Sequence, residues 1–159
     1  MTVHEDWLRQ ISLYKKKMLE ENGVHIELPP PSLIELKSEF LEVVPNKKMV
    51  AKVPFQKRFT NPVGLFQGGF LAAALDDVFG PLSYISAERP CMTLSLNISY
   101  VRTFTEKMGY CVITAEVVQK SASIIFMRAD VLSPDEKLIA HAETHVMIMR
   151  DDHLGKVRM

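Results

Sequence analysis

The chain has 159 residues, of which 47% are hydrophobic and 24% charged, and its acidic and basic side chains balance to a formal net charge of zero. This size and apolar content suit one globular domain with one core, and the absence of net charge excludes a general attraction to nucleic acid or to an anionic membrane surface. The N-terminal residues are acidic, whereas a signal peptide starts with basic and then apolar residues, and no apolar run reaches the roughly 20 residues that span a bilayer. Cys91 and Cys111 lack a C-x-x-C spacing. We therefore expect a protein of the reducing cytoplasm.

Residues 1–31 are expected to form an appendage to the main domain. Between Glu5 and Asn22, apolar side chains recur at helical spacing with lysines on the remaining surface, which predicts an amphipathic helix. A membrane-surface helix is the alternative, but neighbouring acids cancel the lysine charge and favour docking onto the chain's own domain. Pro29-Pro30-Pro31 then forms a stiff connector, and Ser32-Leu-Ile-Glu35 matches a capping box that would start a single helical turn.

The main domain is expected to span residues 32–150, followed by a C-terminal tail at 151–159. Hydrophobic patterns separated by turn residues predict an apolar helix at 70–86 and six strands at 39–44, 49–55, 93–101, 110–119, 124–132 and 137–149. Consecutive long strands with tight turns form an antiparallel sheet, and the single apolar helix can be buried only against it. The expected fold class is α+β, with a long antiparallel sheet wrapped around one central helix and an extra N-terminal helix.

The strand at 93–101 has the clearest pattern in the chain. Its apolar and polar residues alternate strictly, so one face is expected to carry Leu94, Leu96, Ile98 and Tyr100 and the other to carry Thr93.

The last strand carries His141, Glu143 and His145 at alternating positions. These side chains project from one face about 7 Å apart, which could support a metal site. The outward polar face of any sheet gives the same pattern, and we expect no metal.

A loop containing Pro62 and Gly64 leads directly into the apolar helix, which starts with Gly68 and Gly69. The glycines permit close approach of another group. The first N–H groups of the helix are free of intrahelical partners and lie at the positive end of its dipole. The helix start is therefore suited to hold a developing negative charge.

The same helix carries Asp76 and Asp77. At about 1.5 Å rise per residue, Gly68 and Asp76 lie roughly 12 Å apart, too far to act on one carbonyl. Two antiparallel copies related by a two-fold axis would bring the glycine end of one beside the aspartate of the other. Adjacent helical residues point about 100° apart, so at most one of the two aspartates is catalytic. Alternatively, the glycines only shape the turn and the acid is satisfied at a dimer contact.

The stretch Asn61-x-x-Gly64-x-x-Gln67-Gly68-Gly69, followed by Asp76, resembles the signature of hotdog-fold thioesterases of the phenylacetate-pathway and small acyl-CoA thioesterase type. The similarity continues through residues 93–100 and covers about residues 39–150. The resemblance implies a hotdog fold and a hydrolase that cleaves an acyl-CoA or aroyl-CoA thioester into free acid and CoA. It also implies a homodimer, or a homotetramer built from two dimers, and no cofactor beyond the coenzyme A that is part of the substrate.

The resemblance also assigns roles to residues. The Gly68 N–H would polarise the thioester carbonyl, Asp76 would act as general base or nucleophile, Asn61 would position water or the thioester, and Thr93 would assist Asp76. The paired hotdogs of the family bring Asp76 and Thr93 of one chain to Asn61 and Gly68 of the other. Gln67 stands where the family commonly has histidine; glutamine can donate a hydrogen bond but cannot transfer a proton.

Further residues are expected at the borders of this site. Gly69, Phe66 and Asp77 would contact the substrate. The phosphates of coenzyme A would be met by basic side chains near the site in the chain, for which the candidates are Lys57, Arg58, Arg102 and Lys107.

Two other functions remain open. In one, the protein binds acyl thioesters without cleaving them, and Gln67 marks the lost chemistry. In the other, it is a hotdog enoyl-CoA hydratase or dehydratase, which is less favoured because the histidine and acid arrangement of that group is not visible in the sequence.

Overall fold

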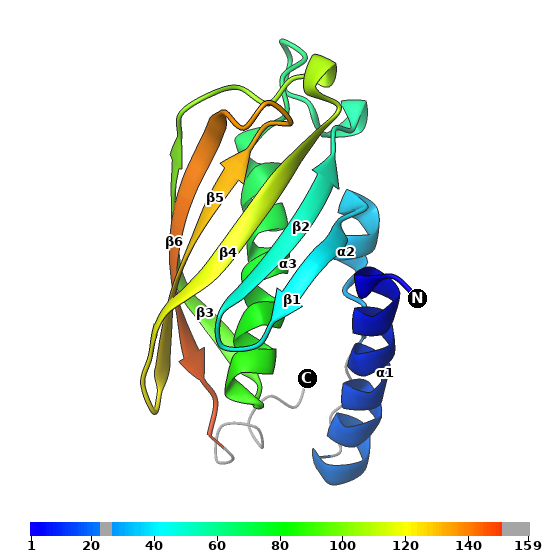
Figure 1. Cartoon of the computed structure of the whole chain (residues 1–159), viewed down its shortest axis with the longest axis vertical. Coiled ribbons are helices and arrows are strands. Elements are labelled where there is room, and N and C mark those ends of the chain that lie inside the picture. The colour runs from blue at the N-terminus through cyan, green and yellow to red at the C-terminus, as the bar shows by residue number, and fades with distance from the viewer. Residues whose placement is uncertain (23–26, 151–159) are drawn as a thin grey trace.

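The computed structural model of the chain describes residues 1–22 and 27–150, so the expected tail at 151–159 lies outside the described residues (Figure 1). Six strands form one antiparallel sheet in the order β1-β2-β4-β5-β6-β3. The elements are α1 (Val3–Asn22), α2 (Pro31–Leu36), β1 (Glu39–Val44), β2 (Lys48–Pro54), α3 (Gly68–Ala87), β3 (Cys91–Tyr100), β4 (Tyr110–Lys120), β5 (Ile124–Leu132) and β6 (Leu138–Ile148), with short 3-10 turns at Lys57–Phe59 and Glu106–Met108. Each predicted strand and both predicted long helices are therefore confirmed, with bounds that shift by a few residues.

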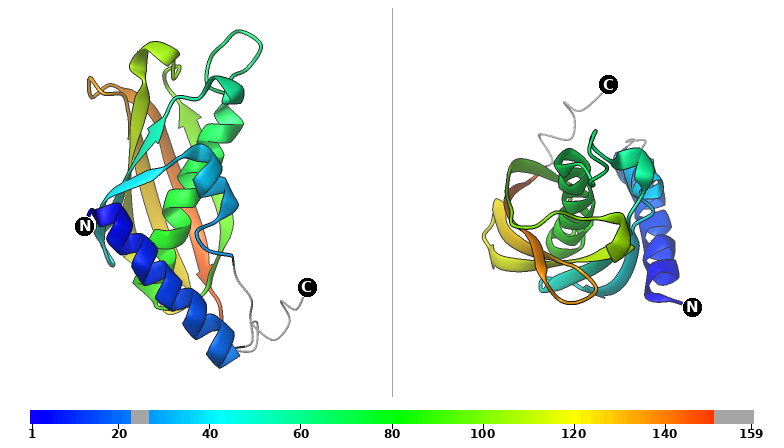
Figure 2. Two further views of the ribbon diagram at one scale, coloured as in Figure 1. Left: turned by 90° about the vertical axis from the view of Figure 1, so that its right-hand side faces the viewer. Right: turned by 90° about the horizontal axis from the view of Figure 1, so that it is seen from above.

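The core lies between α3 and the concave face of the sheet, which curls around the helix (Figure 2). One side of α3 buries side chains at helical spacing, including Leu71, Leu75, Val78 and Leu82. Alternate residues of the strands pack against this side of the helix. In β5 these are Ile125, Met127, Ala129 and Val131. Because apolar area removed from water stabilises folding at about 25 cal/mol per Å², this contact between helix and sheet is the main source of stability. The expected sheet wrapped around one helix is confirmed.

The two edges of the sheet differ. At the β1 edge, α1 docks beside the strand: the Trp7 and Phe40 rings lie 4.4 Å apart between centroids, and the Phe40 N–H donates to His4 Nδ1 at 3.2 Å. The helix therefore packs on its own domain, as the sequence favoured. At the other edge, β3 pairs with β6 on one side only, and it exposes 54% of Leu94 and 52% of Tyr100. A long open edge strand with exposed apolar side chains is ready to pair with another chain.

No helix in the described part of the chain is both long and apolar enough to cross a membrane.

The expected strict alternation of β3 is wrong at its start. Thr93 pairs with Val146 and Ser95 pairs with His145, so the register shifts by one residue at Leu94. This β-bulge reverses the alternation, because two residues of β3 oppose one of β6. Thr93 consequently lies on the face that points toward α3, whereas the sequence pattern placed it on the outer face.

The expected capping box at Ser32 is also wrong, although the helical turn is present. Pro30 is the N-cap of α2 and makes no side-chain cap, since the helix already begins at Pro31. Ser32 lies inside the helix, where its hydroxyl donates to Asp77 Oδ1 at 2.7 Å. The hydroxyl thus ties α2 to the central helix.

Candidate active site

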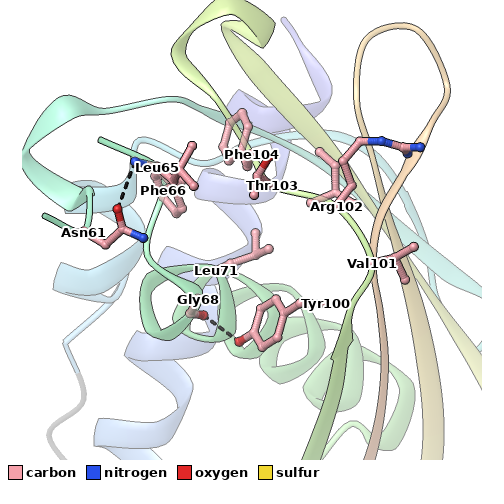
Figure 3. A pocket seen from close by; sticks show the side chains of 11 residues that line it. Asn61, Leu65, Phe66, Gly68, Leu71, Tyr100, Val101, Arg102, Thr103 and Phe104 are labelled. Atoms are coloured by element: carbon pink, nitrogen blue, oxygen red, sulfur yellow. Dashed lines mark hydrogen bonds between the residues drawn. The ribbon is translucent and has the colours of Figure 1, made fainter. Parts of the chain in front are cut away.

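The loop before α3 is shaped by Asn61. Its side-chain Oδ1 accepts the N–H groups of Val63 and Leu65, both at 3.1 Å, and its own N–H donates to the Leu65 carbonyl at 2.8 Å. Gly64 has φ +81°, a conformation that favours glycine. Because the oxygen of the Asn61 amide holds the turn, its Nδ2 remains available as a donor, and Figure 3 shows this nitrogen turned away from the Leu65 bond.

The start of α3 presents unused backbone donors. Gln67 is the N-cap, and its carbonyl accepts the N–H groups of Phe70 at 3.0 Å and Leu71 at 3.3 Å. Within the described residues, no hydrogen bond uses the N–H of Gly68 or Gly69, and the Gln67 side chain makes no capping bond. Free N–H groups at the positive end of a 20-residue helix form the kind of donor set that stabilises an oxyanion.

A cavity of about 380 Å³ lies beside Gly68 (Figure 3). The Tyr100 hydroxyl donates to the Gly68 carbonyl at 2.7 Å, and a Cβ added to Gly68 would lie 3.0 Å from the Tyr100 ring. A side chain at position 68 would therefore press on the Tyr100 ring, and glycine lets that ring pack directly on the helix start. Phe66 lines this cavity while its ring packs on Phe104, 5.0 Å between centroids. Gly69 does not line it.

Sequence reasoning missed Tyr100 as a neighbour of Gly68. The only signal was its place on the apolar face of the strand, which does not identify the end of the helix that it meets. The other residues that line this cavity are Asn61, Leu65, Leu71, Val101, Arg102, Thr103, Phe104 and Ile139.

At mid-helix, the two aspartates point to different surroundings, as expected of adjacent helical residues. Asp76 is exposed, and its Oδ1 accepts a hydrogen bond from Thr93 Oγ1 at 3.0 Å. Asp77 is half-buried, and its Oδ1 accepts the bond from Ser32, while its buried Oδ2 has no hydrogen-bond partner among residues 1–22 and 27–150. The structure thus brings together the pair Asp76 and Thr93, and Asp77 is tied to α2.

Asp76 and Asp77 border a second and larger cavity of about 840 Å³ between α3, α1 and the start of β3. This cavity and the one beside Gly68 have no lining residue in common. A single chain therefore holds the glycine end and the aspartates in separate places, in agreement with the distance expected along the helix.

Burial raises the pKa of the Asp77 carboxyl from 3.8 to about 6, the Ser32 hydroxyl opposes this shift, and the nearby Asp76 charge adds to it. The folded state then holds this proton more tightly than the unfolded chain, so stability is lost as pH rises from about 4 through 6. Asp77→Asn removes this titration. We expect the free energy of unfolding of the wild type, relative to the variant, to fall by about 1 to 2 kcal/mol between pH 4 and pH 7, a value reduced for partial solvent screening.

Urea unfolding of both proteins at pH 4, 5, 6 and 7 measures this difference. Ser32→Ala is the matched control. It removes the hydrogen bond that lowers the pKa of Asp77, so the loss of stability should occur at higher pH. If the free energies of unfolding of the wild type and Asp77→Asn change with pH in parallel, the raised pKa of Asp77 is contradicted.

Of the four basic residues expected near coenzyme A phosphates, two are engaged within the chain. Arg58 pairs with Glu35 at 2.7 Å, and Arg102 donates to the Leu138 carbonyl at 2.8 Å. Arg102 also lines the Gly68 cavity, although its guanidinium extends away from Gly68 in Figure 3. Lys57 and Lys107 lie in the two 3-10 turns.

The alternating polar residues of β6 point outward, where His141 Nδ1 lies 2.7 Å from Asp130 Oδ1. Across the described part of the chain, no three His, Cys, Asp or Glu side chains are grouped so that they could hold a metal ion.

No protein-family model matches the chain. No curated protein matches it either. Solved structures do. A proposed thioesterase of Ralstonia eutropha JMP134, related to phenylacetic acid degradation, is 28% identical with a TM-score of 0.69, and the match covers 85% of this chain and 99% of that one.

Two other solved structures agree in fold. The phenylacetic acid degradation protein of Thermus thermophilus is 24% identical over 76% of this chain and 100% of that one, with a TM-score of 0.68. A thioesterase of Staphylococcus aureus is 18% identical over 74% of this chain and 98% of that one, also with a TM-score of 0.68. The resemblance inferred from the loop and helix at residues 61–76 is confirmed: this chain has the hotdog fold and is similar to the thioesterases related to phenylacetic acid degradation.

Proposed function

We propose that the protein hydrolyses an acyl-CoA or aroyl-CoA thioester to the free acid and CoA, in composite sites that two chains build together. The observation that carries this proposal is the separation of the two halves. Free N–H groups lie at the start of α3, the Asp76–Thr93 pair lies two turns along, and the cavities beside them share no residue. The printed descriptions of the similar proteins as thioesterases support the reaction class.

In the proposed reaction, the thioester carbonyl accepts the Gly68 N–H and the Asn61 Nδ2, both of which lack partners within the described chain. The Asp76 carboxylate, held by Thr93, takes a proton from water, and the hydroxide attacks the carbonyl carbon. The negative charge that develops on the oxygen is stabilised by the helix start. Collapse of the intermediate breaks the C–S bond, and the departing thiolate takes the proton. Direct attack by the Asp76 carboxylate through an anhydride is the covalent variant of the same step.

The open edge of the sheet supports the proposed homodimer. β3 is an open edge of ten residues, and antiparallel pairing with β3 of a second chain satisfies its free backbone groups. The same two-fold axis sets the two α3 helices antiparallel. The half-exposed Ala72 and Ala73 offer little bulk between the helices, so the glycine end of one can approach the Asp76 of the other. A homotetramer of two such dimers keeps the same sites.

We place the enzyme in the cytoplasm, because coenzyme A thioesters are available there and because both cysteines are buried free thiols.

Gln67 is the observation that favours a second candidate, an acyl-thioester-binding protein without turnover. Its exposed amide can orient a carbonyl but cannot move a proton. The proposed mechanism assigns every proton to Asp76 and the leaving group, so Gln67 does not prevent hydrolysis.

The test is release of free thiol from a panel of CoA thioesters with short, long and aromatic acyl groups. We expect turnover of at least one member by the wild type and only background with Asp76→Asn purified in the same way. Saturable binding of a panel member with no thiol release would establish the binding protein instead. Hydration of an enoyl-CoA, measured as the loss of its ultraviolet absorbance, would establish the hydratase.

A further inference from the structure

We infer that the larger cavity receives the acyl part of the substrate, and that a gap over Gly80 together with the N-terminal helix α1 sets which acyl groups fit. This inference rests on the proposed thioester hydrolysis and adds the substrate class: a neutral, apolar acyl group that extends from Asp76 along α3 toward Trp7.

The position of Gly80 gives the direction. It lies four residues after Asp76, so both are on the same stripe of α3, and both line the larger cavity. A Cβ added at Gly80 would meet no atom within 4 Å apart from its neighbours in the chain and the backbone of its own helix. Glycine inside a helix costs about 1 kcal/mol relative to alanine. No positive φ requires it at position 80, although the absence of a Cβ also eases the helical backbone directly before Pro81. The missing side chain leaves open space immediately beside the reacting carboxylate.

The charge of the lining decides which end of the substrate enters. Asp76, Asp77 and Glu88 border the cavity, and no Lys or Arg does so among the described residues. The charged side chains that the phosphates of coenzyme A would meet here are all acidic. An acyl group with a second carboxylate would meet the same acidic side chains. A neutral acyl group avoids this repulsion, and it finds apolar contacts on Ile85, Met92 and Val146.

The far wall comes from the N-terminal region. Trp7 and Ile11 of α1 line the cavity together with Leu28 and Pro30 of the connector. Trp7 is fixed in place, since it is 5% exposed and its ring packs on Phe40. The helix that covers the β1 edge therefore also bounds the cavity, and the length of an acyl group is limited by how it meets α1.

The first experiment measures kcat/KM for saturated acyl-CoAs of increasing length with the wild type, Gly80→Ala and Gly80→Phe. The phenyl group should fill the space beyond Asp76. We expect Gly80→Phe to lower kcat/KM at least tenfold for the longest substrates that the wild type accepts and only a few-fold for acetyl-CoA, since pocket contacts discriminate by about 10- to 200-fold. Gly80→Ala should also lower kcat/KM for the longest substrates, but by a smaller factor. The matched control is Ile34→Phe, which adds the same ring at an exposed position outside the cavity.

The second experiment does not depend on turnover. Trp7 is the only tryptophan of the chain, so its fluorescence reports on this cavity alone. An S-alkyl-CoA thioether, which cannot be hydrolysed, is prepared with bromine at the end of the alkyl chain. Its binding should quench Trp7, and a thioether with bromine beside the sulfur should quench less. Gly80→Phe should lose the quenching by the long thioether.

The outcomes separate the two proposals. Quenching of Trp7 without cleavage of any thioester would overturn the hydrolysis and support the acyl cavity. Cleavage with an unchanged length profile in Gly80→Phe and no quenching in the wild type would overturn the cavity and leave the hydrolysis standing. If Gly80→Phe dissociates or unfolds, the wild-type quenching and the Gly80→Ala profile decide, and absence of both effects overturns the inference.

Discussion

Asp76→Asn is expected to lower kcat by about a hundred- to ten-thousand-fold, the range that a positioned general base contributes. Asparagine keeps the size of the side chain and can still accept the Thr93 hydrogen bond, so the fold and the Michaelis constant should change little. The loss therefore falls on the chemical step. Steady-state thiol release, with circular dichroism of both proteins as the check on folding, measures it.

Asp77→Asn is the matched control, because it makes the same change one residue along the same helix. Asp77 is half-buried against Ser32, so we expect its variant to retain kcat within a few-fold at pH 8. The pH profile adds a second criterion. If Asp77 were the base, its pKa of about 6 would produce an acid limb near pH 6 that disappears in Asp77→Asn. A large loss of kcat in Asp77→Asn together with normal activity in Asp76→Asn would reverse the assignment.

Thr93 extends the same argument. Removing its hydroxyl in Thr93→Ala frees the Asp76 carboxylate from one orienting bond. One hydrogen bond to a charged group is worth about 1.5 to 3 kcal/mol, which corresponds to at least a tenfold loss of kcat. Thr93→Ser retains the hydroxyl and should recover most of the activity, which separates orientation of Asp76 from a packing role.

Much of the fold could be predicted because each element carries its own period. The helix at Gly68–Ala87 is apolar on the side that meets the sheet, and β5 alternates buried with more exposed residues over its whole length. The separation of Gly68 from Asp76 also followed from the sequence, since helical rise is a fixed geometric quantity. These features depend on local structure alone.

The local pattern did not predict the contacts of Thr93 and Ser32, and the pairing of Thr93 with Asp76 was expected only from the resemblance to hotdog-fold thioesterases. Strict alternation placed Thr93 on the outer face, but the bulge at Leu94 turns it toward Asp76. A bulge is set by how two strands and the helix behind them pack, and a single strand sequence does not encode it visibly. Ser32 matched a capping pattern, yet it bonds to Asp77, which is 45 residues away in the chain. In both cases a tertiary contact overrode a local signal.

The composite nature of the site has its own expected result: two inactive variants should restore activity when they share a dimer. Asn61→Asp keeps the oxygen that holds the turn with Val63 and Leu65 but replaces the Nδ2 donor with an anion. Loss of one such donor costs about a hundred- to a thousand-fold in kcat. Asp76→Asn breaks the other half. Each variant alone should be nearly inactive.

A mixed dimer of Asn61→Asp and Asp76→Asn has one site with both defects and one site with neither. Random co-assembly makes half of the dimers mixed, and half of their sites are intact, so total activity should return to about a quarter of the wild type. The same fraction holds for a tetramer of two such dimers. Co-expression with two affinity tags and sequential purification isolates the mixed species, which should reach about half of the wild-type kcat.

The matched control mixes Asp76→Asn with Asp76→Ala, in which both chains break the same half and no intact site can form. If the mixed dimer of Asn61→Asp and Asp76→Asn stays as inactive as this control, each site lies within one chain. Because Gly68 and Asp76 lie on the same helix, α3 itself would then have to bend or unwind between them before catalysis. Recovery to the expected level assigns the start and the middle of one helix to two different active sites. The Asp76 of each chain would then act on a thioester whose carbonyl is held by the helix start of its partner.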